Sequence, residues 1–342
     1  MKNLITTYLT LLLSMAVCAQ TPVEIKDISG YGQKKFKEAP KKIYIAQFRV
    51  NFQLLYSQVE KDEGGRTLGG GYRGEAKAGL TMAVQGIESN DLLEITDKLY
   101  TQYLERLKQE GYEVLTADQV EGAKSFEGWE RKEGGTLNEA QYPGYITVIP
   151  TGYEYYVKRT KESGREKSTF VDNTLNISND VEAAAVKINI VVPFVEDAES
   201  GASKALGKAV GGLAKVVLRP YLRIEKDLVG TAGGFSTDAA LTKSTYAYKK
   251  GMKTQAISNF QLKSSIDIPG IFEEKKYKAV ETADTDLWGT SVGALTIFNV
   301  SDKYLSKTQP LPCNASQYKS SVTEAAGSFL NTALDEFLSN AK

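Results

Sequence analysis

The chain has 342 residues, of which 42% are hydrophobic and 25% are charged, and this balance is typical of a globular protein. Its 42 Lys and Arg residues equal its 42 Asp and Glu residues, so the formal net charge is zero and does not favour nucleic acid as a partner. There is no histidine, which excludes a Ser-His-Asp triad, a Cys-His pair and a His-ligated metal site. An enzyme with this composition would have to use carboxylates, a Lys base, a Tyr acid or an oxygen-ligated cation.

Residues 1–19 predict an export signal. Lys2 gives a positive start, an apolar run follows over 9–17, and Val17-Cys18-Ala19 places small residues before a cleavage point. The run is too short to span a bilayer stably. A lipoprotein signal also ends at a cysteine, but a valine precedes this one where Gly, Ala or Ser is usual. We expect an exported, periplasmic or extracellular protein that begins at Gln20, with an outer-membrane lipoprotein as the alternative.

Cysteine usage excludes a disulfide framework in the expected mature chain. Cys18 is removed with the signal if cleavage follows Ala19, which leaves Cys313 as the remaining cysteine. One thiol forms neither an intramolecular disulfide nor a thiolate zinc site. Stability must therefore come from an apolar core, and a chain of this length can bury one or two cores of ordinary size.

The first part of the chain predicts a strand, a second strand, a helix and a short strand. Residues 43–50 are rich in β-forming side chains and continue toward Tyr56, and residues 80–87 have the same character. Over 91–110, apolar residues recur at helical spacing, and Gly111 stands where a helix C-cap belongs. A short strand at 112–115 and a long loop or a small excursion over 122–144 complete this part.

The rest of the chain predicts mostly strands and a final helix. Residues 145–157 predict a strand, which the charged turn centred on Ser163-Gly164 returns as a hairpin into 168–177. Further strands are expected over 186–194, 217–225, 245–248, 254–268 and 294–300. A helix over 316–338 places one apolar face toward the protein, formed by Val322, Ala326, Phe329, Ala333 and Phe337.

This order of elements predicts an α+β fold with a mixed or mostly antiparallel sheet. The early amphipathic helix and the C-terminal helix are expected to pack on that sheet. We expect one α+β envelope domain over 20–342, within which the β-rich range at about 145–270 is a candidate insertion.

The same order resembles the superfamily of the curli-secretion channel and its periplasmic relatives. The strand at 43–50, the helix-Gly-strand unit over 91–115, the strand at 145–157 and the amphipathic last helix carry the likeness, over about half of the chain. The resemblance implies a cell-envelope protein with an α/β core that acts by binding or assembly and not by catalysis. The better-known members are lipid-anchored, and the valine before Cys18 departs from that pattern. The paired membrane-spanning hairpins of the channel members are not identifiable in the sequence.

Two local patterns suggest ligand sites. Gly69-Gly70-Gly71-Tyr72-Arg73-Gly74 fits the dinucleotide fingerprint, but that motif has meaning only between a strand and a helix, and a strand-like segment follows here. Asp284-Thr285-Asp286-Leu287-Trp288-Gly289 resembles the start of a calcium loop, but Trp288 and Leu295 stand where ligands are needed. We expect a flexible hairpin loop and a solvated acidic turn, with no cofactor and no metal.

A hydrolase is the alternative from another class. It would use acids near Asp284 and Asp286, which Asp267 and Glu281 could join in space. A glycosidase pair is defined by the separation of two carboxylates across a cleft, which the sequence does not show. We therefore predict no catalytic residue.

A Gly- and Ala-rich segment with spaced lysines, over 200–218, is a candidate for a membrane or oligomer contact. Its members of interest are Lys204, Gly207, Lys208, Gly211 and Lys215. Small residues with lysines can form a helix that lies on a membrane or packs closely on a neighbour. Because each Gly in a helix interior costs about 1 kcal/mol, a loop is the favoured interpretation.

A tyrosine cluster is the candidate interaction surface. Strand alternation places Tyr145, Tyr153 and Tyr155 on one face, where an exposed row could stack on sugars or on a partner protein. Half-buried packing is the more common role of Tyr in strands. The sequence thus predicts a non-catalytic envelope protein with a binding, structural or assembly role and an envelope protein or glycan as partner. The alternative is an oligomeric outer-membrane-associated secretion or pore component.

Overall fold

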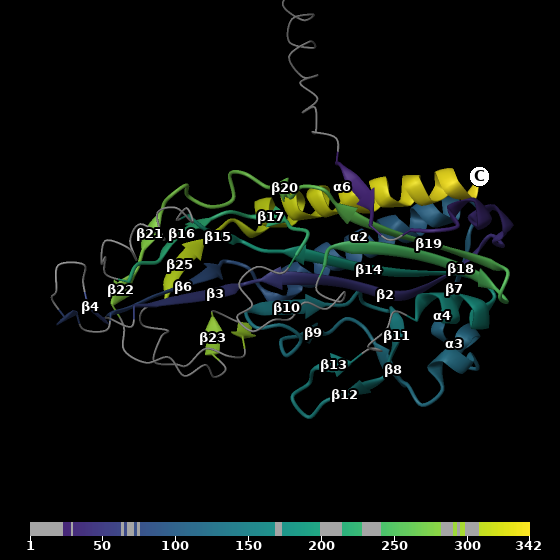
Figure 1. Cartoon of the computed structure of the whole chain (residues 1–342), viewed down its shortest axis with the longest axis horizontal. Coiled ribbons are helices and arrows are strands. Elements are labelled where there is room, and N and C mark those ends of the chain that lie inside the picture. The colour runs from purple at the N-terminus through teal and green to yellow at the C-terminus, as the bar shows by residue number, and fades with distance from the viewer. Residues whose placement is uncertain are drawn as a thin grey trace, which may run out of the picture.

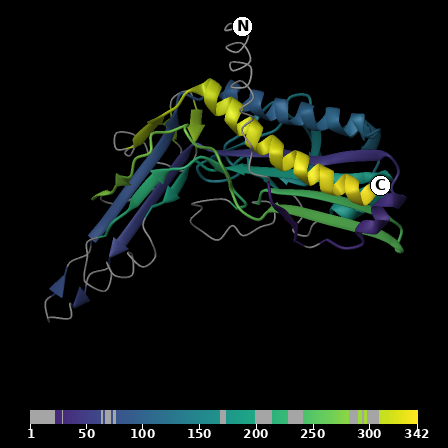
Figure 2. The ribbon, with the colours of Figure 1, turned by 90° about the horizontal axis from the view of Figure 1, so that it is seen from above.

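The computed structural model describes residues 23–28, 30–62, 65–66, 72–73, 76–167, 173–198, 214–227, 241–281, 290–292, 295–297 and 308–342. The predicted export signal lies outside these residues. A central sheet carries two long helices on one face, and an arm of strands projects from one end of the molecule (Figures 1 and 2).

The central sheet has eight strands in the order β1-β19-β18-β14-β2-β10-β9, with β7 also paired to β2. The strands are β1 (Ile25–Asp27), β2 (Lys42–Gln53), β7 (Glu113–Leu115), β9 (Leu137–Asn138), β10 (Tyr145–Val148), β14 (Ala184–Val192), β18 (Lys243–Lys250) and β19 (Thr254–Leu262). Strand β14 runs parallel to β2 and antiparallel to β18, so the sheet is mixed and the predicted α+β class is confirmed. The range 145–270 supplies four of these strands, β10, β14, β18 and β19.

Two helices, α2 (Ser89–Gln109) and α6 (Ala315–Ala341), lie side by side on one face of the sheet (Figure 2). They run parallel, because Lys319 contacts Asp91 at 2.9 Å near both N-termini and Arg106 contacts Asp335 at 2.5 Å near both C-termini. Both predicted helices are confirmed. Gly111 follows α2 with a φ of 81°, the left-handed conformation expected after a helix.

The apolar core fills the space between this helix pair and the sheet. From β2 it takes the buried side chains Ile43, Ile45, Phe48, Val50 and Phe52. Phe337 of α6 stacks on Tyr246 with ring centroids 4.3 Å apart and meets Phe36 edge-on at 5.2 Å. Phe36 lies on η1 (Gln33–Glu38), a short 3-10 helix that precedes β2.

Shorter elements cover the opposite face. They are α3 (Ala117–Val120), η2 (Lys124–Phe126) and α4 (Thr174–Val181), and Ile177 of α4 packs with Phe126, Tyr44 and Ala185. The prediction of a strand through 177 is therefore wrong for residues 174–177, because packing on the sheet favours a helix there. The hairpin before it is short and pairs β12 (Arg159–Thr160) with β13 (Glu166–Lys167).

Three long predicted strands are each divided. The segment 145–157 turns at Pro150-Thr151-Gly152, and its second part, β11 (Glu154–Val157), pairs with β8 (Glu130–Glu133) in another sheet. Gly152 has a φ of 68°, which ends the extended backbone. Likewise, β16 (Val217–Pro220) is separate from β17 (Arg223–Ile224). The strand predicted over 254–268 divides into β19 and β20 (Ile266–Asp267), and β20 pairs with β17 in another sheet.

The arm continues the central strand out of the body. Only Leu54 separates β2 from β3 (Leu55–Asp62), which pairs antiparallel with β6 (Ala76–Gln85) from Leu55 opposite Ala83 to Asp62 opposite Ala76. Gly144 lies against the bend, where a Cβ would approach the carbonyl oxygen of Leu55 to 2.3 Å. This close approach requires glycine.

Further strands widen the arm. They are β4 (Gly65–Arg66), β5 (Tyr72–Arg73), β15 (Val195–Asp197), β21 (Tyr277–Lys278), β22 (Val280–Glu281), β23 (Thr290–Val292), β24 (Leu295–Ile297) and β25 (Gln309–Pro312). Strands β22 and β25 pair with β6, and β15, β16 and β21 form a second ladder. Gln58 of β3 donates to the Asp197 carboxylate at 3.2 Å, which joins the two ladders. None of the described helices combines the length and the apolar character needed to cross a membrane.

Candidate functional site

Alternation along β2 gives the central sheet a polar face. Phe48, Val50 and Phe52 enter the core beneath the helices, so Arg49, Asn51 and Gln53 point to the other face. All three of these polar side chains are buried. Buried polar groups are stable only when they are hydrogen-bonded, so their partners define what this face does.

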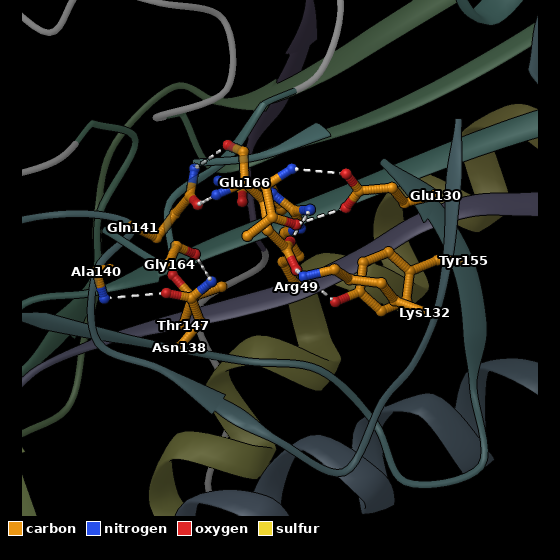
Figure 3. A network of polar contacts seen from close by, with 12 residues as sticks. Arg49, Glu130, Lys132, Asn138, Ala140, Gln141, Thr147, Tyr155, Gly164 and Glu166 are labelled. Carbon is orange, nitrogen blue, oxygen red and sulfur yellow. Dashed lines mark hydrogen bonds and ion pairs between the residues drawn. The ribbon is translucent and has the colours of Figure 1, made fainter. Parts of the chain in front are cut away.

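The carboxylate of Glu166 is the centre of an ion cluster on this face (Figure 3). Arg49 Nη2 lies 2.7 Å from Glu166 Oε2, Lys132 Nζ lies 3.2 Å from Oε1, and the Tyr155 hydroxyl donates to Oε1 at 2.8 Å. The Glu166 side chain is only 4% exposed. The Tyr155 pKa is raised, first by burial and then by the neighbouring Glu166 charge, so the phenol keeps its proton and remains a donor.

A single amide side chain holds the backbone of Glu166 in place. The Glu166 N–H donates to Gln141 Oε1 at 3.1 Å, and Gln141 Nε2 donates to the Glu166 carbonyl oxygen at 3.3 Å. On the paired strand, Thr160 donates to Glu130 through its hydroxyl at 2.8 Å. These contacts fix the short hairpin β12–β13 against the body of the protein.

Amide and hydroxyl groups continue the network across three strands of the sheet. Thr147 of β10 donates to Asn51 Oδ1 at 2.7 Å, and Asn51 Nδ2 donates to Asn189 Oδ1 of β14 at 3.0 Å. Asn189 in turn donates to the Leu241 carbonyl oxygen at 2.7 Å. These cross-strand contacts hold β10, β2 and β14 in one register, whereas Arg49 Nε on the same face has no hydrogen-bond partner among the described residues.

The outer face of the same hairpin carries positive charge. Glu166 and Thr160 point inward, so alternation places Arg159, Lys161, Arg165 and Lys167 on the opposite side. Arg159 stands directly opposite Lys167. The pKa of Lys167 is lowered, first by Arg159 and then by Lys161, because these like charges are close together. We call these four residues the basic hairpin.

The Glu166 cluster is an internal network that fixes the hairpin β12–β13 in place. The Glu166 carboxylate accepts from three donors, so it is a poor general base. In the part of the chain that the structure describes, no three His, Cys, Asp or Glu side chains come together in a way that could hold a metal ion. What the site presents to solvent is the row of cations on the basic hairpin.

The three tyrosines predicted as an interaction surface are buried. Tyr153 stacks on Tyr155 with ring centroids 5.7 Å apart, and its hydroxyl donates to the Ile45 carbonyl oxygen at 2.9 Å. Tyr145 lies on β10 in a separate cluster with Tyr142. The turn at 150–152 divides the expected row, so the prediction of an exposed row is wrong and packing accounts for these residues.

The other predicted positions are spread over the chain. In the lysine- and glycine-rich segment, Lys204, Gly207, Lys208 and Gly211 lie outside the described residues, while Lys215 is exposed just before β16. The fingerprint at 69–74 includes β5 and is followed by strand β6, not by a helix.

The acidic candidates do not form a described site. Asp284 and Asp286 lie outside the described residues. Asp267 accepts a hydrogen bond from the Tyr221 hydroxyl, and only the backbone of Glu281 is described, in β22.

Sequence reasoning missed the Glu166 cluster. Arg49 and Glu166 are 117 positions apart, and Glu166 stands in a run of charged residues that predicts a solvated turn. The alternation of Arg49, Asn51 and Gln53 with apolar residues was the available signal for a polar sheet face. Comparison with known proteins adds no assignment, since no family model, no curated protein and no solved structure matches the chain.

Proposed function

We propose that this protein is an exported, non-catalytic component of the cell envelope with a binding, structural or assembly role, and that the arm is its assembly element. The observation that carries the proposal is the direct continuation of the central strand β2 into β3 of the arm. Because β2 lies between β14 and β10 in the sheet, a load on the arm passes directly to the centre of the fold.

The pairing of the arm supports a role in contacts with another chain. Among the described strands, β3 pairs with β6 alone and stands at the end of its sheet. A projecting strand at a sheet edge is a template for strand addition by a second chain. The expected partner is a second copy of this protein, since a strand-forming arm on each copy supplies both sides of such a contact.

Replacement of residues 58–80 by Asn-Gly tests the proposal, because it removes most of the edge of β3. Ser57 and Thr81 are paired across the hairpin, so a two-residue turn can join them without a change in the body. We expect the parent chain to form oligomers in size-exclusion chromatography with light scattering, and the shortened chain to be monomeric with an unchanged circular dichroism spectrum of the body.

A matched control shortens the other hairpin. Thr160 and Glu166 are also paired, so Asn-Gly can replace residues 161–165 in the same way. This variant should keep the oligomeric state of the parent. A monomeric parent, or equal oligomers in the parent and the arm-shortened chain, would contradict the assembly role of the arm.

The projection of the arm also supports the second candidate, an oligomeric outer-membrane-associated secretion or pore component (Figure 2). That function agrees with the resemblance to the curli-secretion channel superfamily. It predicts that the native protein is extracted only by detergent, as ring-shaped particles with a lipid-modified Cys18. Mass spectrometry of the mature N-terminus and electron microscopy of the detergent extract distinguish it from a water-extracted chain that begins at Gln20.

A further inference from the structure

The exposed large hydrophobic side chains of the described residues are Met252, Tyr31 and Ile28, and they share one edge of the molecule. Met252 is 92% exposed, Tyr31 47% and Ile28 39%. Tyr31 pairs with Ile257 of β19, and the Ile28 N–H donates to the Asn259 carbonyl oxygen of the same strand at 3.0 Å. Met252 lies in the turn that joins β18 to β19. The turn between β18 and β19 lies at the end of the molecule opposite the arm (Figure 1).

Lysines surround the exposed methionine. Lys250 and Lys253 flank it and are exposed, and Lys35 of η1 reaches the Lys253 carbonyl oxygen with its Nζ at 2.6 Å. η1 thereby brings two more exposed lysines, Lys34 and Lys37, to this edge. We call this set, Met252 and the lysines at 34, 35, 37, 250 and 253, the lysine-methionine edge.

The acidic side chains of this edge already have partners in the protein. Asp27 accepts from the Asn259 N–H at 2.9 Å and from Gln33 at 3.3 Å, and Glu38 accepts from the Thr254 hydroxyl at 3.0 Å. Although the whole chain has a formal net charge of zero, the segments 33–38 and 250–253 hold five lysines and one acid, Glu38. The excess charge is therefore a local property of these two segments.

We propose that the lysine-methionine edge docks on the surface of an anionic phospholipid bilayer. An unbranched apolar side chain at the apex of a turn can enter the boundary between headgroups and acyl chains, while flanking lysines contact lipid phosphates. The basic hairpin is a useful contrast, because its turn holds Glu162, Ser163 and Gly164 and offers no apolar side chain for insertion. The combination of an apolar apex and cations therefore favours a lipid surface over a soluble anion.

Vesicle flotation with the purified full chain tests this proposal. The parent should float with vesicles of phosphatidylglycerol and phosphatidylcholine in equal parts and remain at the bottom with pure phosphatidylcholine. Met252→Asp and the pair Lys250→Glu and Lys253→Glu should each lower the bound fraction about tenfold, and 0.5 M salt should lower it for the parent because charge attraction is screened.

The matched control is the pair Lys161→Glu and Lys167→Glu, which makes the same change in charge at the basic hairpin and should leave flotation unchanged. Circular dichroism confirms the fold of each variant.

Met252→Trp adds a direct readout, since the fluorescence of the new tryptophan should shift to shorter wavelength only with anionic vesicles. No flotation of the parent, equal flotation with neutral vesicles, or an equal loss in the control pair would overturn the proposal. Because the edge and the arm lie at opposite ends, the arm-shortened chain should still float, which separates the two proposals.

Discussion

The two faces of the central sheet are stabilised in different ways. Beneath α2 and α6 the face is apolar, and Phe337 packs there against the rings of Tyr246 and Phe36. On the other face, Glu166 meets two cations and a phenol, and Asn51 connects three strands. The apolar face is stabilised by burial, which is non-directional, whereas the polar face depends on each group finding a specific partner. Two truncations on the apolar face should therefore lower the free energy of unfolding by about the sum of their separate losses. Two substitutions on the polar face should instead show coupled losses.

The largest expected effect is on the apolar face. Phe337→Ala removes a fully buried ring that contacts Tyr246, Phe36 and Tyr112, so it should lower the free energy of unfolding by about 4 kcal/mol. Urea unfolding followed by circular dichroism measures this change. Phe272→Ala truncates a half-buried ring outside α6 and should lower the free energy of unfolding clearly less. If Phe337→Ala lowered it no more than Phe272→Ala does, α6 would contribute little to the core.

The buried ion pair should show strong coupling. Glu166→Leu leaves Arg49 buried beside Lys132 without a counter-charge, and should lower the free energy of unfolding by about 3 kcal/mol. In the double variant Arg49→Met and Glu166→Leu, the loss should be smaller than the sum of the two single losses. Additive losses in this double-mutant cycle would mean that the two charges are independently solvated.

Alkaline pH should weaken the apolar face through its buried phenols. Burial raises the pKa of Tyr246 to about 12, from an ordinary value near 10. The neutral phenol therefore contributes stability that is fully present below pH 10 and is lost as the pH rises toward 12, by about 2 kcal/mol. Urea unfolding at about pH 9 and about pH 11 should show this loss in the parent and a smaller one in Tyr246→Phe. An equal loss of stability between these two pH values in Tyr246→Phe would assign the loss to other groups.

The smallest expected effect is a gain on the helix layer. Gly327 of α6 faces α2, and an added Cβ would lie 3.8 Å from Leu99 Cδ2, an ordinary contact distance. Gly327→Ala should therefore raise the free energy of unfolding by about 0.5–1 kcal/mol, because Ala favours the helix and fills space without strain. A loss of stability in urea unfolding would show that the two helices are packed more tightly than this distance indicates.

The two faces also differ in how far the sequence predicts them. The helices α2 and α6 follow from apolar residues at helical spacing over many turns, and β2 and β14 follow from runs of β-forming residues. The break at 150–152 also had a local signal, since Pro150 and Gly152 punctuate the expected strand.

The polar face and the arm depend on contacts between distant residues. Glu166 is indistinguishable in sequence from the solvated charges beside it, and only the folded chain brings it to Arg49. In the same way, the run from β2 into β3 reads as one strand, while Leu54 and Gly144 turn it out of the sheet through a contact across the fold. Periodicity describes a segment and its solvent-facing side, but not the partner that the segment meets.

The ribosome synthesises α6 long after β2, and this order affects how the nascent chain folds. Strand β2 leaves the ribosome well before α6, the helix that covers its apolar face, and at roughly 5–20 residues per second the interval is on the order of 15–60 s. During that time the sheet face has no cover from α6, so early collapse would leave apolar surface open to aggregation or to holding chaperones. The core between the sheet and the helices therefore cannot be completed before α6 emerges.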